Sequence, residues 1–286
     1  MCEYVTINNR MIGGLNMNTK IVSFCNQKGG VGKTSTTALV AYNLSKMGYK
    51  TLVLDFDPQA NMTSLMLKTK SQNADDIEVI NNTLMNAIKK DENLLDTVIP
   101  ISDNLYLIPN AVDFSLYGRF LENTFEQEKD KVSFLSKLLK RDLVGHFDFI
   151  FIDVPPTLSL QNDTAYFACD DIIIVLQTQQ HSLDGAEDLI DYIQDTIIDE
   201  FGSNVIVIGV LPVLSKRGAA VDAVILKKAE ELWGNDVLKT HIHLMERVKR
   251  MDITGITDNP HDTWDQRTLN TYKNVAKELV NKIKEE

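Results

Sequence analysis

The sequence contains the glycine-rich stretch Lys28-Gly29-Gly30-Val31-Gly32-Lys33-Thr34, between an apolar run at 21–25 and a helix-like segment at 36–46. A strand, a glycine-rich turn, Lys-Thr and a helix are the successive parts of a phosphate-binding P-loop. Glycines let the backbone wrap closely around an anion, and the N–H groups of the following helix N-terminus point at it. The stretch therefore predicts a phosphate site where a strand meets a helix.

The two lysines of this loop are expected to have different tasks. Lys33 would reach the β- and γ-phosphates of a nucleotide, and the Thr34 hydroxyl would bind Mg²⁺. The standard P-loop pattern has its first glycine where this chain has Gln27, and a second lysine, Lys28, opens the loop instead. A lysine there can reach the phosphates of a facing subunit, as an arginine finger does. The predicted nucleotide-binding residues of the loop are Lys28, Gly29, Gly30, Val31, Gly32, Lys33, Thr34 and Ser35.

Carboxylates follow two of the apolar runs. The run at 51–55 continues as Asp55-Phe56-Asp57-Pro58-Gln59-Ala60-Asn61, and the run at 148–153 ends in Asp153. Because ligands bind at the carboxyl ends of parallel strands, we expect Asp57 to orient or deprotonate an attacking water, and Asp55 to hold the loop or a metal-bound water. Asp153 has the Walker B position, which holds Mg²⁺ through water. Taken alone, the Asp-Pro pair is equally typical of a solvated turn or a helix cap.

Together these pieces resemble one family. The string Asn26-Gln27-Lys28-Gly29-Gly30-Val31-Gly32-Lys33-Thr34 resembles the deviant Walker A loop of the ParA/MinD ATPases. The stretch 55–61 is similar to the D-x-D-P-Q-G/A-N motif of that family, and Asp153-Val154-Pro155-Pro156 is similar to its Asp-x-Pro-Pro. The resemblance covers roughly residues 18–286 and is most specific over 20–63 and 148–157.

Weaker matches extend the nucleotide site. The segment 177–185 is similar to the family's connection between a core strand and the next helix, although the family usually has Glu where Gln179 stands. The segment 209–214 resembles the strand end beside the adenine ring. The resemblance implies that Gln59, Leu211 and Pro212 also contact the nucleotide. It further implies a magnesium site made of Thr34, with Asp57 and Asp153 acting through water.

Apolar runs alternate with helix-like segments along the rest of the chain, which predicts a doubly wound α/β domain with a mainly parallel sheet. A single P-loop NTPase domain would span 20–286, and the polar segment 69–100 would be a surface insertion. Residues 1–19 would form a flexible extension that is too short for a helix-turn-helix domain. The expected strands are 21–25, 51–55, 105–108, 148–153, 171–177 and 204–211, and the expected helices are 33–47, 60–67, 131–143, 183–198, 218–233 and 268–284.

Composition excludes several classes of protein. The net charge is 29 − 40 = −11, which argues against a wholly basic nucleic-acid coat. Cys2, Cys25 and Cys169 lie far apart with no C-x-x-C pair, so we expect neither disulfides nor a zinc site. The sequence lacks an apolar run of membrane-spanning length and a secretory signal pattern, which favours a cytoplasmic location without membrane attachment.

The segment 216–250 is basic within this acidic chain. It holds eight lysines and arginines against five acidic residues, a local balance of 8 − 5 = +3. A surface for the DNA phosphate backbone needs such an asymmetry, although a solvated helix face with internal ion pairs has the same composition. The predicted DNA-binding residues are Lys216, Arg217, Lys227, Lys228, Arg247, Lys249 and Arg250.

The resemblance implies a plasmid-partition ATPase that uses ATP and Mg²⁺, and the stretches 253–256 and His261-Asp262 are similar to the type found on plasmids of Gram-positive bacteria. ATP would join two subunits face to face, with each Lys28 contacting the other subunit's nucleotide. The homodimer would bind nonspecific DNA of the nucleoid until a ParB-type centromere-binding partner stimulates slow hydrolysis through Asp57.

Two alternatives remain open at this point. One is a MinD-like membrane-associated positioning ATPase, and the other is a P-loop ligase or synthetase of the dethiobiotin synthetase type. The apolar residues of 269–283 recur at helical spacing with no Phe or Trp among them. This pattern favours a terminal helix packed on the core over a membrane-binding helix.

Overall fold

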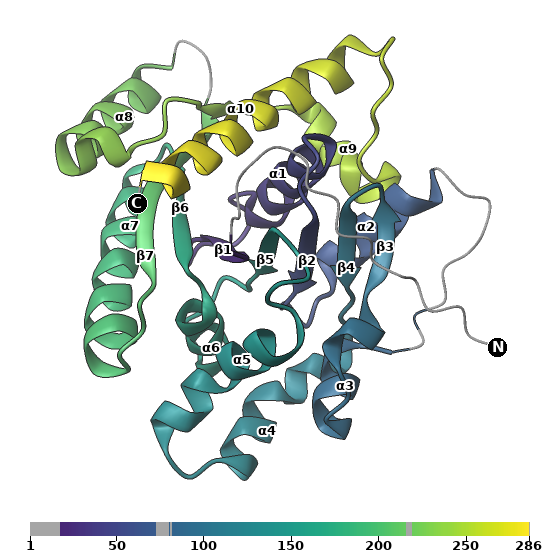
Figure 1. The fold of residues 1–286 in the computed structure, drawn as a ribbon. Helices are drawn as coiled ribbons and strands as arrows, with labels where there is room; N and C mark the ends of the chain where they lie inside the picture. The colour runs from purple at the N-terminus through teal and green to yellow at the C-terminus, as the bar shows by residue number, and fades with distance from the viewer. Residues whose placement is uncertain (1–17, 73–79, 81, 216–218, 286) are drawn as a thin grey trace.

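The computed structural model describes residues 18–72, 80, 82–215 and 219–285 of the chain. Its strands form one sheet in the order β3-β4-β2-β5-β1-β6-β7-β8 (Figure 1). Neighbouring strands pair in parallel, apart from the antiparallel edge pair of β3 and β4. The predicted mainly parallel α/β fold is therefore confirmed. The strands are β1 (Lys20–Cys25), β2 (Thr51–Asp55), β3 (Ile99–Ser102), β4 (Leu105–Ile108), β5 (Phe149–Asp153), β6 (Asp171–Gln177), β7 (Ile206–Ser215) and β8 (Ile242–His243).

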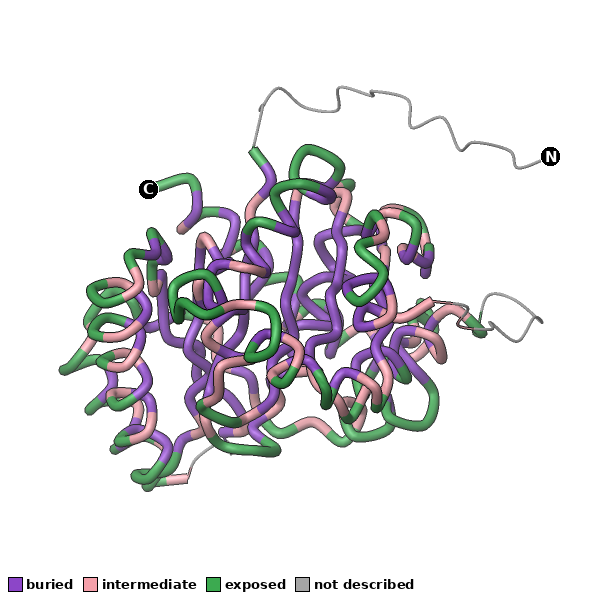
Figure 2. The backbone as a smooth tube through the Cα atoms, turned by 90° about the horizontal axis from the view of Figure 1, so that it is seen from below, coloured by how far each residue is buried: buried purple, intermediate pink, exposed green. Residues whose placement is uncertain are grey.

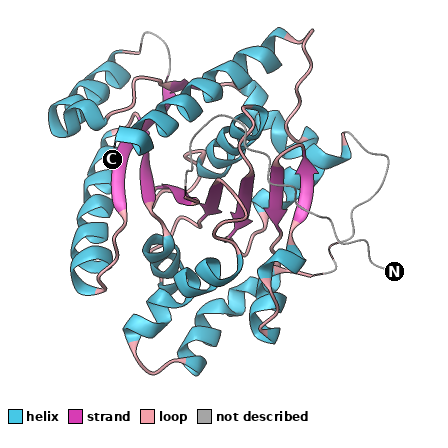
Figure 3. Ribbon diagram, in the orientation of Figure 1, coloured by secondary structure: helices cyan, strands magenta, loops and turns pink. Residues whose placement is uncertain are grey.

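Helices cover both faces of this sheet (Figure 3). One face packs against α1 (Lys33–Lys46), α2 (Asn61–Ser71), α9 (Glu246–Thr254) and α10 (Thr263–Glu285). The other packs against α3 (Leu84–Lys90), α4 (Tyr117–Thr124), α5 (Glu128–Asp142), α6 (Leu160–Ala168) and α7 (Gln180–Tyr192), and α7 continues into a π-helical stretch, η3 (Ile193–Glu200). The helix α8 (Ala220–Trp233) contacts α7 and β7. Short 3-10 turns are η1 (Leu94–Thr97), η2 (Val112–Leu116) and η4 (Gly234–Asp236).

Alternate strand residues enter two separate hydrophobic cores. On β1, Val22 and Phe24 pack with α1 and α10, whereas Ile21 and Cys25 pack on the opposite face. Both faces are buried, which is why the central strands are continuous apolar runs, and Figure 2 shows these strands as buried in the middle of the molecule. Charged residues of the central strands stand only at strand ends, and the carboxyl ends of β2, β5, β1 and β6 lie next to one another.

The strands predicted at 51–55, 105–108 and 171–177 have these bounds in the structure, whereas the terminal helix predicted at 268–284 already starts at Thr263. The strand predicted at 204–211 instead starts at Ile206 and continues to Ser215. The helices α4, α6 and α9 and the edge strands β3 and β8 were not predicted, because each is too short to show a clear period. The terminal helix does pack on the core, with Tyr272 and Val275 buried against the α1 side. Across the described ranges, none of the helices combines the length and apolarity that a bilayer crossing requires.

The prediction of a surface insertion at 69–100 is wrong for the described residues from 84 onward. Leu84, Met85 and Leu94 are fully buried in the core, and β3 extends the sheet. The polar composition of this segment belongs to its outer side, while its apolar residues cover the sheet edge. Residues 73–79 and 81 lie outside the described residues, as do residues 1–17 of the predicted extension. Thr19 is already anchored, since its hydroxyl donates to the Phe147 carbonyl at 2.7 Å.

Candidate functional site

The loop between β1 and α1 has the backbone that its glycines predict. Gly30 has φ +74° and Gly32 has φ +89°, a left-handed conformation that side chains rarely adopt. Asn26 fixes the start of the loop, because its Oδ1 accepts from the Lys28 N–H at 2.6 Å and its Nδ2 donates to the Val175 carbonyl at 2.5 Å. The loop is thereby attached to β6 and opens onto the N-terminus of α1.

Lys33 is buried across this loop. Its ammonium donates to the Lys28 carbonyl at 3.2 Å, so the side chain turns back over the backbone that would surround a phosphate. Burial lowers the pKa of Lys33, and the charges of Asp153 and Asp57 oppose that shift. Both carboxylates therefore lie near enough to act on the same ammonium, which is the neighbourhood predicted for the phosphate and its metal.

Asp153 closes β5 and is buried beside Asp55, its register partner on β2. Burial, together with the neighbouring Asp55 charge, holds the pKa of Asp153 well above its usual range, while a hydrogen bond from Thr34 opposes that shift. The Asp153 Oδ1 atom has no hydrogen-bond partner among the described residues. A buried carboxylate oxygen that lacks a donor, next to a threonine hydroxyl, fits the oxygen ligands that Mg²⁺ takes.

Asp55 holds the loop that follows β2. Its Oδ2 accepts from the Thr63 N–H at 2.7 Å and the Thr63 hydroxyl at 2.6 Å, and its Oδ1 accepts from the Asp57 N–H at 3.2 Å. Burial raises the pKa of Asp55 to about 6, although these hydrogen bonds oppose the shift. Of the two roles expected for Asp55, the geometry gives it that of holding the loop.

Asp57 is half-buried at the same edge of the sheet. One carboxylate oxygen accepts from the Gln59 N–H at 2.9 Å, and the Asp57 carbonyl accepts from the Asn110 amide at 3.1 Å. The carboxylate thus stays at the mouth of the site, where a water could approach it, and the side chain of Gln59 is exposed beside it.

The first turn of α6 ties together the two loops that carry the carboxylates. Gln161 donates to the Phe56 carbonyl at 2.5 Å, immediately before Asp57. Asn162 is fully buried and donates to the carbonyls of Pro155 and Thr157 at 2.8 and 2.6 Å. Sequence reasoning missed the roles of these amides and those of Asn26 and Asn110. Gln161, Asn26 and Asn110 donate to backbone carbonyls far away in the sequence, which no local pattern indicates.

Lys28 is exposed, and its side chain contacts its own subunit. Its ammonium donates to Gln179 Oε1 at 2.7 Å and to Gln177 Oε1 at 3.1 Å. The structure therefore separates the two lysines of the loop, because Lys33 turns back over the loop backbone whereas Lys28 lies at the carboxyl end of β6.

The two residues predicted to contact adenine lie inside β7. Leu211 and Pro212 are buried and pair with Val175 and Leu176 of β6, and the strand runs on to Ser215. A base at the end of this strand would therefore meet the backbone beyond Pro212 first.

This site matches known proteins. The family model of the AAA domain matches residues 19–207, a range that includes the loop, Asp57 and Asp153. The chain belongs to this family of ParA/MinD-type P-loop ATPases. Among its relatives, the chromosome-partitioning ATPase Soj of Treponema pallidum is 26% identical over 261 residues, which cover 91% of this chain and 97% of that protein.

Solved structures share the fold of this P-loop ATPase. A plasmid partition protein from Borrelia burgdorferi superposes with a TM-score of 0.66 at 19% identity, over 92% of this chain and 99% of that one. Cobyrinic acid a,c-diamide synthase from Mycobacterium smegmatis, with a bound ATP analog and magnesium, superposes with a TM-score of 0.74 at 21% identity, over 92% and 94%. At these identities the likeness establishes the fold alone, which proteins of different function share.

The predicted DNA-binding residues that the structure describes fall on two helices of this P-loop ATPase. On α8, Lys227 pairs with Glu231 at 3.6 Å, and Lys228 donates to Gln180 Oε1 at 2.8 Å. Lys249 and Arg250 lie on α9, toward the other end of α10 in Figure 1, so one subunit does not join the two groups into a single patch. Lys216 and Arg217 lie outside the described residues.

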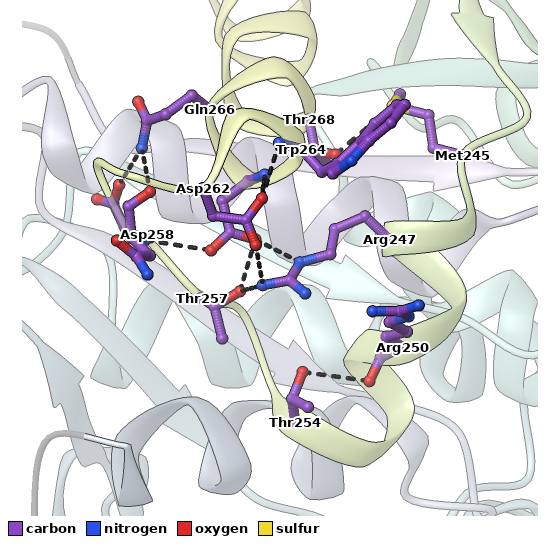
Figure 4. Close-up of polar contacts among 12 residues, drawn as sticks. Met245, Arg247, Arg250, Thr254, Thr257, Asp258, Asp262, Trp264, Gln266 and Thr268 are labelled. Carbon is purple, nitrogen blue, oxygen red and sulfur yellow. Dashed lines mark hydrogen bonds and ion pairs between the residues drawn. The ribbon is translucent and has the colours of Figure 1, made fainter.

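Arg247 points toward Thr257 and Asp262, whereas Arg250 of the same helix does not contact them (Figure 4). Its guanidinium pairs with Asp265, donates to Thr257 at 2.6 Å and lies 3.6 Å from Asp262, so that only 19% of the side chain is exposed. Lys249 instead pairs with Glu246 at 2.8 Å and stays 60% exposed. We call Arg247, Thr257, Asp262 and Asp265 the α9–α10 corner. In this geometry Arg247 connects two helices and has little surface left for DNA.

Proposed function

We propose that this P-loop ATPase is a DNA-partition ATPase that hydrolyses ATP with Mg²⁺ and binds nonspecific DNA as a nucleotide-dependent homodimer. The observation that carries the proposal is the division of labour in one loop, with Lys33 buried over the phosphate site and Lys28 exposed beyond it. A phosphate site within one subunit needs only Lys33, so a second lysine suits a site that two subunits share. The partition role of the Treponema pallidum relative, similar along most of its length, supports the proposal.

Each residue at the site has a role that its position allows. The loop N–H groups and the α1 N-terminus bind the phosphates, and Lys33 neutralises charge on the β- and γ-phosphates. Asp57 orients a water toward the γ-phosphorus, whose bond to the bridging oxygen breaks to release ADP and phosphate. Bound Mg²⁺ would supply further charge neutralisation, held by Thr34 and by Asp153 and Asp57 through water. Ser35 and Gln59 complete the proposed phosphate contacts. A base would meet β7 through its backbone at and beyond Leu211 and Pro212, because both residues are buried within the strand.

DNA would bind to the nucleotide-bound dimer. The exposed cations of α8 and α9 would contact separate phosphates of the backbone, without reading base sequence. The proposed contacts are Lys227, Lys228, Lys249 and Arg250, together with Lys216 and Arg217. A ParB-type centromere-binding protein would stimulate hydrolysis and release the dimer from the nucleoid.

The test of the shared site is the substitution Lys28→Ala, with Lys33→Ala as the matched control in the same loop. We expect Lys28→Ala to bind ATP as a monomer, because only the cross-subunit contact is lost, and Lys33→Ala to lose ATP binding itself. Sedimentation with ATP and Mg²⁺ gives the oligomeric state, and nucleotide titration gives the affinity. A Lys28→Ala protein that dimerises like the wild type and keeps stimulated hydrolysis would falsify the cross-subunit role.

One observation favours the membrane-associated alternative. Ile253 on α9 is 78% exposed, and Trp264 at the start of α10 is 65% exposed. Deleting residues 269–286 would remove buried core residues of α10, so a double substitution, Ile253→Ser with Trp264→Ser, is the better probe. ATP-dependent sedimentation with anionic liposomes that this variant loses, without DNA retention in either protein, would favour the alternative.

A further inference from the structure

We infer that Gln177 and Gln179 are positioning residues that hold Lys28 within its own subunit and thereby set the ATP concentration at which the dimer forms. This inference rests on the proposed function, because Lys28 must leave the two glutamines to reach another subunit's nucleotide. No catalytic contact is assigned to either glutamine.

The holding site is built on rigid structure. Gln177 is the last residue of β6, Gln179 immediately precedes α7, and the Gln179 N–H donates to the Gln177 carbonyl at 2.7 Å. The backbone of Lys28 is fixed through Asn26, whose amide donates to Val175 on the same strand. The lysine and both of its acceptors are therefore attached to β6, so the two contacts of 2.7 and 3.1 Å need no distant element to form.

The chemistry of the two acceptors allows Lys28 to leave them again. Both acceptors are neutral amide oxygens, so the Lys28 ammonium meets only their dipoles. A carboxylate in the same place would add attraction between opposite charges to the hydrogen bond. While Lys28 occupies this site, a subunit is not competent for the cross-subunit contact. The apparent affinity for dimer formation is the intrinsic affinity multiplied by the fraction of subunits whose Lys28 has left the two glutamines. Weaker acceptors would therefore promote the dimer, and a charged acceptor would oppose it.

The neighbouring Gln180 provides a matched control. It is exposed and directly follows Gln179, but its Oε1 accepts from Lys228 of α8 at 2.8 Å instead of from Lys28. Gln180→Glu therefore adds the same charge one residue away from Gln179→Glu without adding it to the Lys28 contact. A general effect of negative charge at the start of α7 would appear in both variants.

Opposite changes should follow from opposite substitutions. We expect Gln179→Glu to raise the ATP concentration for half-maximal dimer formation about threefold or more, and Gln177→Ala with Gln179→Ala to lower it about threefold. Gln180→Glu should match the wild type. Sedimentation across a series of ATP concentrations measures all four proteins, and thermal unfolding checks that each is folded.

A second readout does not depend on dimer formation. In the nucleotide-free protein, the rate at which an amine-reactive succinimidyl ester modifies Lys28, measured by mass spectrometry, should rise in the double alanine variant and stay unchanged in Gln180→Glu. An unchanged Lys28 modification rate in the double alanine variant would overturn the inference even if the proposed function holds. If Lys28→Ala dimerises normally while the modification rate does rise, the proposed function fails and the holding contact stands, but without its assigned effect on the dimer.

Discussion

Asp153 at the carboxyl edge of the sheet and Asp265 in the α9–α10 corner are both buried to 1% exposure, and each lies near a basic side chain. Their pKa values nevertheless move in opposite directions. Burial raises the pKa of Asp153 well above its usual range, whereas hydrogen bonds from Arg247 and Thr257 overcome burial and hold the pKa of Asp265 below its usual value.

The two carboxylates show how a ligand site can be told from a structural one. The protein itself satisfies Asp265, so that carboxylate stabilises the fold and has nothing left to bind. It leaves one oxygen of Asp153 without a donor among the described residues, so that carboxylate is costly until something binds it. The unsatisfied carboxylate of Asp153, at the carboxyl ends of the strands, therefore predicts a ligand site. The satisfied carboxylate of Asp265, in the α9–α10 corner, predicts a role in stability.

Asp153→Asn should reduce activity strongly without reducing stability. We expect Mg²⁺-dependent ATP turnover to fall by at least about 100-fold, because the metal loses a charged ligand. Thermal stability without nucleotide should stay equal or rise, because the substitution removes an unsatisfied buried charge. Turnover and melting temperature are measured on the same preparation. A variant that loses stability along with activity would mean that Asp153 is structural, like Asp265.

Arg247→Ala should give the reverse result. Removing it leaves the buried Asp265 charge unpaired, so we expect about 2 kcal/mol less stability by denaturant unfolding, with ATP affinity unchanged. Lys249→Ala is the control on the same helix, because its exposed pair with Glu246 contributes less than about 1 kcal/mol. If Arg247→Ala and Lys249→Ala are equally stable, the buried pair of Arg247 does not stabilise the fold more than the exposed pair of Lys249.

The two exposed cations of α9 should affect DNA and not stability. We expect Lys249→Ala with Arg250→Ala to weaken nonspecific duplex binding about tenfold and to reduce the slope of log affinity against log salt by about 2. Binding is measured with ATP at several salt concentrations. If the doubly substituted protein retains the wild-type salt slope, the DNA surface lies elsewhere.

The pH dependence of stability gives the smallest and most specific contrast. The pKa of Asp153 is raised in the folded state. Its contribution to the free energy of unfolding is therefore fully present below the unfolded-state pKa of about 3.9 and is lost as pH rises through the folded-state pKa. The pKa of Asp265 is lowered in the folded state. Its contribution to the free energy of unfolding is therefore present above the unfolded-state pKa of about 3.9 and is lost as pH falls through the folded-state pKa. Without nucleotide, Asp153→Asn should gain stability over the wild type as pH rises, whereas the deficit of Asp265→Asn should shrink as pH falls below about 4. If the stability of both variants changes with pH in the same way as that of the wild type, neither carboxylate has the pKa shift assigned to it.

The arrangement of the proposed nucleotide site was predictable because its residues lie in contiguous motifs. Gly30, Lys33 and Asp153 have types and positions that a local pattern fixes, and the long apolar runs predicted the central strands. The direction of Arg247 was not predictable, since it depends on Asp265, which lies beyond a turn and whose role no local pattern indicates. The segment 69–100 was misjudged for a related reason: its polar outer side dominates its composition, while residues such as Leu84 and Leu94 cover the sheet edge.

The most direct test of the account is retention of nonspecific duplex DNA by the wild-type protein with ATP, with ADP and without nucleotide, all with Mg²⁺. We predict salt-sensitive retention with ATP alone, because only the ATP-joined dimer brings enough cations to one duplex. Equal retention of DNA in all three states, or no retention in any of them, would contradict the proposal that the nucleotide bound at the carboxyl ends of the strands controls DNA binding.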